Sequence, residues 1–586
     1  MRRDLGFVAY WVSVIIGAGL LLLPLQSYTT GYLPLWFLII AVSLYITAIY
    51  TRLAHAIRRH VAENVNLTVE RGTPAAARIG ISSSTWMAAQ RMSLLEIISG
   101  RGQSLYDDLI ESRLDPRCSK TWARVSFVSG ILFFVFFSVA AYVSVGGRSL
   151  SSLVPFVARR TELPWLLLVA GVMFVSLAAY LSRYTTSTVL WHGVVIRLLA
   201  LFGSWAIALF VLAQLPSSEW ESFLIFALSL LPPILLRAKI ADGSGAGVSE
   251  QRRHGAVLYD HHRLSVAVVL MEMLLLVIAV VLIVFAFAVS GTFRSPQLLV
   301  SPLTLGALGK TAGVVVFAFV GTGIYNLMCY PSLLDSARRL RNVIILGTAL
   351  PTLAYLVWSF VVAITLSPSQ IQALNGSAGS YPTIVLARMV MERYPLLGLI
   401  ISIFGYAFAM LAVSMASIGF VETLSDRVTI DVIIRANRFF PFNSLLAWLG
   451  NRRELVNAAL LVATAVFAVF TLAVHIEVTT VVGVAGIAGG GLILLVIPWL
   501  IADEAGGTVP LRRVVIAFLS LVFVAAVSVS NINMNNLFGP RFLITLPLAA
   551  LTLWVIGVGI LTLPWRWNRR RRMLAVEDDT QETGAA

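Results

Sequence analysis

The strongest constraint on this chain is its succession of long apolar segments. A helix needs about 20 mostly apolar residues to cross a bilayer, and in lipid its backbone must satisfy its own hydrogen bonds. Fourteen segments of the 586-residue chain fit this description. They lie near 7–26, 32–53, 124–145, 164–182, 191–213, 221–237, 264–290, 311–331, 342–366, 396–421, 456–475, 479–502, 513–531 and 542–563. We therefore predict an all-α polytopic membrane protein with about 14 transmembrane helices.

The composition points the same way. Apolar residues make up 58% of the chain and charged residues 12%, whereas soluble domains have roughly 45–50% and about 25%. This composition excludes a disordered chain, a coiled coil and a disulfide scaffold. The net charge of +15 on so apolar a chain indicates membrane orientation rather than nucleic-acid binding. The expected surroundings are a lipid bilayer, with no nucleic acid.

The distribution of charge predicts the topology. With the N-terminus in the cytoplasm, alternating spans place 34 Arg and Lys residues inside, 8 outside and one, Arg197, within a span. All twelve Asp residues also fall on the cytoplasmic side. This asymmetry is what the positive-inside rule predicts. We expect an even number of spans, both termini in the cytoplasm, and a plasma-membrane location.

Motifs for catalysis or metal binding are missing from the sequence. There is no P-loop, no H-E-x-x-H and no nucleophile elbow. The histidines His254, His261 and His262 with Asp260 have no regular ligand spacing and indicate a solvated loop. We therefore predict no enzyme activity, no cofactor and no metal site. Many spans with few intramembrane charges favour a carrier of small solutes.

Two glycine pairs mark places where helices can break. The first span contains Gly17, Ala18 and Gly19, and the eighth contains a second G-x-G at 321–323. Carriers often bind solutes where helices are interrupted near the membrane midplane. The two spans run in opposite directions, as inverted repeats require. Small residues also mark close helix packing, and the motif alone leaves this alternative open.

The sequence resembles a known family at three places. The string I-G-A-G-x-L-x-x-P at 16–24 is similar to the first-helix signature of the hydroxy and aromatic amino acid permeases, of the amino acid–polyamine–organocation superfamily. A weaker match is the acid-x-x-x-acid pattern from Glu422 to Asp426. The remaining match keeps the pattern L-R…G-x-x-x-P-x-x-x-Y-x-x-W, with Arg339, Leu340, Arg341, Val343, Gly347, Pro351, Tyr355 and Trp358. The eighth span departs from the family because it lacks the histidine and proline that follow F-G-F there.

The resemblance implies a leucine-transporter-like core of 5+5 inverted repeats. The spans starting near 7, 32, 124, 164 and 191 form the first repeat, and those near 311, 342, 396, 456 and 479 the second. The expected organisation is 1–53 for the first two helices with the broken first helix, 54–123 for a cytoplasmic insert, 124–213 for the rest of the first repeat, 214–310 for an inserted helix pair, 311–502 for the second repeat, and 503–586 for peripheral helices and a basic cytoplasmic tail.

The broken helices predict a site for an amino acid zwitterion. A break at Gly17–Gly19 leaves N–H groups with partial positive charge, which stabilise a carboxylate. We therefore expect Gly17, Ala18 and Gly19 to bind the carboxylate of an amino acid-like substrate. Carbonyl groups at the opposite break suit its amine end. The residues predicted there are Phe319, Gly321, Thr322 and Gly323.

Sodium coupling is disfavoured by the tenth span. The positions that align with the family's sodium-binding hydroxyls are Leu411 and Ala412, which cannot ligate sodium. Ser414 and Ser417 can do so only if the alignment is shifted. We therefore predict proton-coupled (H+) or uncoupled transport.

Two charged residues are candidates for coupling. Arg197 lies a turn or two inside the fifth span, where its permanent charge can replace an ion; its alternative is snorkelling to the interface. Glu272 is the only carboxylate well inside a predicted span, and such a charge is expensive there. Its alternative is a neutral or interhelix-bonded glutamate. Two other functions also stay open: a flippase for lipid-linked sugars, and a non-transporting sensor or scaffold with the permease fold.

Overall fold

The computed structural model describes ten helices and some shorter pieces of the chain. The described residues are 8, 11–12, 15, 19–76, 120–158, 161–184, 190–215, 219–236, 298, 303–320, 336–367, 394–395, most of 410–421, 453–473, 478–486 and 489–491. Within them all regular secondary structure is helical, which confirms the all-α prediction. The seventh, thirteenth and fourteenth predicted spans lie outside these residues, so the number of spans stays a prediction.

Each of the ten described helices overlaps one of the predicted spans. Five of them are long and apolar enough to cross a membrane, and three apolar ones are shorter. The helices are α2 (Gly19–Thr30), α3 (Tyr32–Ala76), α6 (Lys120–Ala158), α7 (Leu163–Tyr184), α8 (Leu190–Gln214), α9 (Glu219–Ser229), α12 (Leu305–Phe319), α15 (Ala337–Thr365), α21 (Arg453–Ala473) and α22 (Val478–Val484).

Two helices extend well beyond the predicted spans. Helix α3 continues past residue 53 to Ala76, so the predicted insert 54–123 begins as a direct continuation of the second span. Helix α6 continues past 145 to Ala158. Arg148, expected in an outer loop, therefore lies inside α6 and is half-buried. Hydropathy locates the apolar part of a helix, whereas polar residues at its ends can continue the same backbone hydrogen bonds.

Prolines explain why the sixth predicted span does not form one regular helix. Helix α9 ends at Ser229, and the next residue, Leu230, lies in a turn. The N–H of Leu230 donates to the carbonyl of Ala227 at 3.0 Å. Pro232 and Pro233 have no N–H to continue the helical ladder. A short helical stretch follows to residue 236.

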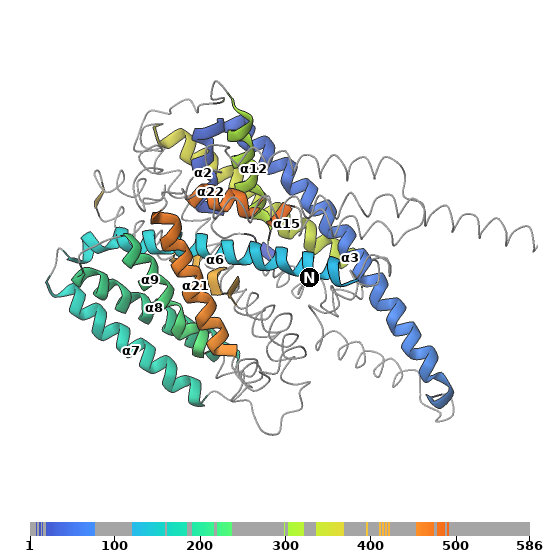
Figure 1. Ribbon diagram of the computed structural model, residues 1–586, viewed down its shortest axis with the longest axis horizontal. Coiled ribbons are helices and arrows are strands. Elements are labelled where there is room, and N and C mark those ends of the chain that lie inside the picture. The colour runs from blue at the N-terminus through green and yellow to red at the C-terminus, as the bar shows by residue number, and fades with distance from the viewer. Residues whose placement is uncertain are drawn as a thin grey trace, which may run out of the picture.

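The described helices form two groups (Figure 1). Helices α2 and α3 pack against each other and both pack against α12 and α15, and we call these four helices the site bundle. Helices α6, α7, α8, α9 and α21 form the flanking group, in which α6 contacts α7, α8, α9 and α21. Helix α22 packs against both α12 and α6. The site bundle therefore combines the first two spans of each predicted repeat.

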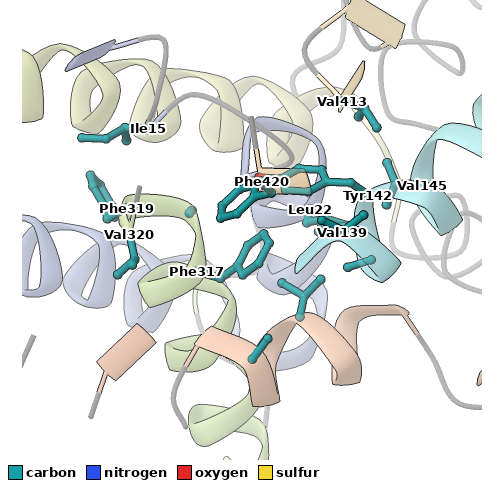
Figure 2. Packing of buried hydrophobic residues seen from close by; sticks show 14 of the residues in the cluster. Ile15, Leu22, Val139, Tyr142, Val145, Phe317, Phe319, Val320, Val413 and Phe420 are labelled. Carbon is teal, nitrogen blue, oxygen red and sulfur yellow. The ribbon is translucent and has the colours of Figure 1, made fainter. Parts of the chain in front are cut away.

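Four aromatic rings connect the two groups. Phe134 and Tyr142 from α6 meet Phe317 from α12 and Phe420 from the tenth predicted span, and we call these four residues the aromatic quartet. Figure 2 shows Tyr142, Phe317 and Phe420. Each ring contacts two others, with ring centroids 5.6–6.1 Å apart. All four residues are buried. Side chains rather than closely packed backbones therefore join α6 to α12.

A single glycine allows the tight turn between α2 and α3. Gly31 has a φ of 88°, a left-handed conformation that costs glycine little. Its N–H donates to the carbonyl of Ser27 at 2.9 Å, which closes the end of α2. The chain therefore reverses into α3 within one residue.

Candidate functional site

Helix α12 ends inside the eighth predicted span. Phe319 is its last residue, and Val320 is extended, with φ −88° and ψ 109°. The N–H of Val320 still donates to the carbonyl of Val316 at 3.0 Å. Both Phe319 and Val320 are buried. The helix therefore stops well before residue 331, next to the predicted G-x-G, whose residues Gly321, Thr322 and Gly323 lie outside the described residues.

In the first span, the structure describes Ile15 before the glycine motif and the helix from Gly19 onward. Ile15 is helical and buried, and α2 begins at Gly19. Gly17 and Ala18 lie outside the described residues. The predicted break between them therefore stays a prediction, while the groups that flank it can be placed.

Helices α2 and α12 pack side by side and antiparallel. At one end, Gly19 lies against Ala318, near the end of α12. At the other end, the Thr311 hydroxyl donates to Oε1 of Gln26 at 3.4 Å. Moving forward along α2 therefore means moving backward along α12. The first residues of α2 and the last residues of α12 are therefore adjacent, which agrees with the opposite directions predicted for the two spans.

Tyr355 from α15 contacts the two segments that precede the glycine motifs. Its hydroxyl donates to the carbonyl oxygen of Ile15 at 2.8 Å and lies 3.2 Å from that of Ala318. Its ring contacts Phe319 edge-on, with centroids 5.3 Å apart. Figure 2 shows Ile15 and Phe319 in one part of the core, and Phe317 directed toward Phe420 and Tyr142. Three oxygen atoms from three segments thus converge in a buried apolar region.

The spacing of the ninth-span motif explains how Tyr355 reaches this place. Gly347, Pro351 and Tyr355 are four residues apart, so they lie along one face of α15. At Gly347 this face receives the ring of Trp11, and at Tyr355 it reaches Ile15. The G-x-x-x-P-x-x-x-Y pattern therefore describes the face of α15 that packs on the first span.

Gly19 is required for close packing. A Cβ atom at this position would lie 2.5 Å from the Cβ of Ala318 and 2.9 Å from the Tyr355 hydroxyl oxygen. Real Cβ atoms are essentially never found this close to other atoms. Close helix packing, which the sequence analysis left open as an alternative explanation of the glycine motif, is therefore observed at Gly19. Binding of a carboxylate by Gly19 stays a prediction.

A buried polar cluster lies at the other end of the α2–α12 contact. Gln26 and Thr311 are buried, and the Thr29 hydroxyl lies 3.5 Å from that of Thr311. The Thr29 hydroxyl also donates to the backbone carbonyl of Gln26 at 2.9 Å. These uncharged side chains satisfy one another in an apolar interior. The cluster therefore holds α2 and α12 together.

Within the described part of the tenth span, from residue 410 to 421, few side chains could ligate a cation. Leu411 is buried in the apolar core, and the Ser417 hydroxyl donates to the carbonyl of Val413 at 2.7 Å. Ser414 is fully buried, and its hydroxyl has no hydrogen-bond partner among the described residues. Ser414 is therefore the one hydroxyl here whose role in ion coupling needs testing.

The two charged candidates cannot be placed at the site. Arg197 lies on α8, in the flanking group, but its side chain lies outside the described part. Glu272 lies outside the described residues altogether. In the described part of the chain, no three His, Cys, Asp or Glu residues are grouped as a metal site would require.

The sequence analysis missed part of the group formed by the Ile15 and Ala318 carbonyls and the Tyr355 hydroxyl. The carbonyl groups of Ile15 and Ala318 were not predicted to contribute, and Tyr355 entered only as part of the family pattern. Its four-residue spacing from Pro351 and Gly347 was the available signal. Backbone carbonyls leave no mark in a sequence, because every residue has one.

Comparisons with known proteins add little to this picture. No protein-family model and no curated protein matches the chain. Among solved structures, a manganese transporter of Eremococcus coleocola, crystallised with an aromatic bis-isothiourea substituted compound, is similar at 14% sequence identity. The match covers 83% of this chain and 96% of that one, with a TM-score of 0.34. A TM-score this low does not establish a shared fold, and the function proposed below rests on the residues of this chain.

Proposed function

We propose that this chain is a secondary transporter that moves amino acids or similar small zwitterionic solutes across the plasma membrane by alternating access. The observation that carries the proposal is the convergence of Ile15, Ala318 and Tyr355 oxygens where α12 ends. Non-helical backbone, such as the extended Val320 at the end of α12, is tolerated at membrane depth only where protein or a cavity surrounds it. Such places are the usual binding sites of carriers.

The helix ends suit the two charges of a zwitterion. The end of α12 at Phe319 carries partial negative charge on its last carbonyl groups. An ammonium group is stabilised there, near Ala318 and the predicted residues of the second motif. The predicted break at Gly17–Gly19 gives the segment that follows it the opposite polarity at its first N–H groups, which suits a carboxylate. We therefore propose that Gly17, Ala18 and Gly19 bind the carboxylate.

The division into two groups supports alternating access. The site bundle contains the first two spans of each predicted repeat, and it meets α6 of the flanking group through the rings of the aromatic quartet. Rocking of one group against the other exposes a central site to each side in turn. We therefore propose a core of 5+5 inverted repeats with both termini in the cytoplasm.

The proposal is tested by exchange, which needs no knowledge of the coupling ion. Purified protein in proteoliposomes is loaded with a mixture of the common L-amino acids, and entry of each labelled amino acid is measured. We expect at least one to exchange well above empty liposomes, and Gly17→Val to abolish this exchange in a folded protein. Gly490→Ala is the control, because its methyl group meets only ordinary contacts of 3.4 Å or more. Exchange of no amino acid by the unmodified protein would refute the proposal.

Coupling is tested separately. We propose that transport is proton-coupled or uncoupled, because the apolar side chain of Leu411 stands where the family resemblance implies a sodium ligand. Net uptake is measured with sodium replaced by choline, with and without an imposed proton gradient. Strict dependence of uptake on sodium would contradict this part of the proposal and leave the exchange result intact.

A further inference from the structure

Helices α3 and α15 pack side by side and antiparallel. The hydroxyl groups of Ser43 and Thr352 lie 2.6 Å apart. Further along the same contact, the indole N–H of Trp36 donates to the carbonyl of Leu356 at 3.3 Å. Because both helices rise by about 1.5 Å per residue, a residue some steps after Ser43 lies close to the level of the residue as many steps before Thr352.

Each of these two helices has one exposed apolar stripe. The stripe residues are Leu33, Phe37, Ile40, Leu44 and Ala48 on α3, and Ile345, Leu346, Leu350, Leu353 and Phe360 on α15. Leu44 and Leu353 directly follow the paired Ser43 and Thr352. Because the helices are antiparallel, these two leucines turn to the same side of the pair. The stripes therefore form one apolar surface, which we call the α3–α15 surface.

Both stripes become polar at the same level. On α3 the last exposed apolar residue is Ala48, and His55 is the next exposed residue. On α15 the first exposed apolar residue is Ile345, and the exposed residues before it include Arg338 and Arg341. Counted from the paired hydroxyl groups, the two boundaries are five and seven residues away, so they lie within about 3 Å of one level. A shared boundary of this kind marks the edge of the hydrocarbon region.

The three exposed polar residues meet just beyond this boundary. His55 is 12 residues after Ser43, and Arg341 and Arg338 are 11 and 14 residues before Thr352. The histidine of α3 therefore lies at a level between the two arginines of α15. Residues that are far apart in the sequence are brought together at one point of the membrane edge.

Charge at this point is positive. Neither α15 nor α3 from Tyr32 to Arg58 contains an acidic residue, and residues 335–341 hold three arginines and one aspartate. Arginines three residues apart on a helix are neighbours, and like charges so placed repel each other. Arg58 and Arg339 have further interactions of their own, so the site is assigned without them.

The opposite end of the α3–α15 surface carries aromatic rings. Tyr32 lies 4.7 Å from Trp36 and 5.7 Å from Phe360, measured between ring centroids. Tyrosine and tryptophan are enriched where a membrane meets water. From Asn342 to Phe360 the helix rises about 27 Å, which is close to the roughly 30 Å of a hydrocarbon core. The apolar surface therefore runs from one membrane edge to the other.

We propose that Arg338, Arg341 and His55 bind the phosphate of an anionic phospholipid, whose acyl chains lie on the α3–α15 surface. Guanidinium groups bind phosphate through two parallel hydrogen bonds, and an imidazole adds an N–H donor. In the predicted topology this end is cytoplasmic, so the lipid belongs to the inner leaflet. A soluble phosphate would use the basic residues alone, whereas a lipid also covers the exposed side chains of Leu346 and Leu353.

The test measures thermal unfolding of the purified protein in micelles of an uncharged detergent. Phosphatidylglycerol, or phosphatidylcholine with the same acyl chains, is titrated, and the rise of Tm gives an apparent Kd. We expect phosphatidylglycerol to stabilise the protein more strongly. Arg338→Gln combined with Arg341→Gln should weaken its binding about 10- to 30-fold, since each basic residue near a membrane surface contributes a similar amount.

A matched control removes the same charge elsewhere. Arg569→Gln combined with Arg570→Gln takes two charges from the basic tail and should leave the apparent Kd near that of the unmodified protein. Arg338→Lys combined with Arg341→Lys keeps the charge but not the paired hydrogen bonds, and should fall between the two. Equal weakening by the tail variant would overturn the proposal, because any basic segment would then serve.

Two further outcomes are read from the unmodified protein alone. Equal stabilisation by the two phospholipids would overturn the proposal and leave the arginines a role in membrane orientation only. Equal stabilisation by soluble glycerol phosphate would identify a site for a soluble anion and exclude the lipid. None of these results depends on amino acid exchange, so failure of the proposed function would be seen separately.

Discussion

Replacing Gly347 with alanine tests how α15 is seated against the first span. A Cβ atom at Gly347 would lie 2.5 Å from Cγ and 2.7 Å from Cβ of Trp11, and it would also overlap Cδ1. Trp11 is fully buried, and its ring packs edge-on against Tyr50 with centroids 5.4 Å apart. The ring therefore has no open space into which it can move, and the first-span segment must shift away from α15.

The expected cost follows from overpacking. Inserting a methyl group into a well-packed core costs about 1–3 kcal/mol. Trp11→Ala alone removes a large buried ring and costs about 3–5 kcal/mol. In the double variant the new methyl group occupies part of the space left by the ring. We expect its free energy of unfolding to exceed the additive value by about 1–2 kcal/mol, as found for residues in direct contact.

The measurement is equilibrium unfolding in mixed micelles, followed by tryptophan fluorescence and far-UV circular dichroism. Gly490→Ala serves as the control for introducing a methyl group at a buried glycine with ordinary contacts. Amino acid exchange should fall with Gly347→Ala, because the Ile15 carbonyl moves with Trp11 away from the Tyr355 hydroxyl. Unchanged stability of Gly347→Ala, or strict additivity in the double variant, would show that this contact does not seat the helix.

Three further changes test other parts of the structure. Thr311→Val removes the hydroxyl that bonds Gln26 across α2 and α12, and we expect a loss of about 0.5–1.5 kcal/mol in the same unfolding assay; an unchanged value would mean that the cluster does not hold these helices. Phe317→Ala removes two contacts of the aromatic quartet and should cost about 3–5 kcal/mol, whereas Val169→Ala on the exposed face of α7 should change stability by about 0.5 kcal/mol or less. Ser414→Ala should leave exchange and its ion dependence unchanged; loss of a sodium response would identify Ser414 as a cation ligand.

Part of the fold follows from apolar length alone. The predicted spans 164–182 and 191–213 agree with α7 and α8 to within two residues at every end, because an apolar stretch of this length forms a helix whatever packs beside it. The end of α12 at Phe319 does not follow from apolar length, because apolar residues continue past Val320 and hydropathy does not report backbone conformation. The G-x-G at 321–323 was the sequence signal for an interruption there, and only the structure locates the last helical residue.

Some features of the candidate site can also be predicted from the sequence, whereas others depend on how the helices pack. A helical chain with membrane-length segments, two glycine motifs in spans predicted to run in opposite directions, and the alignment of Gly347, Pro351 and Tyr355 on one helix face can all be read from the sequence alone. The hydrogen bond from the Tyr355 hydroxyl to a carbonyl 340 positions away is visible only in the folded chain. This is because hydrogen bonds between distant segments depend on how closely helices approach. That distance is set where shapes fit, at Trp11 against Gly347 and Gly19 against Ala318.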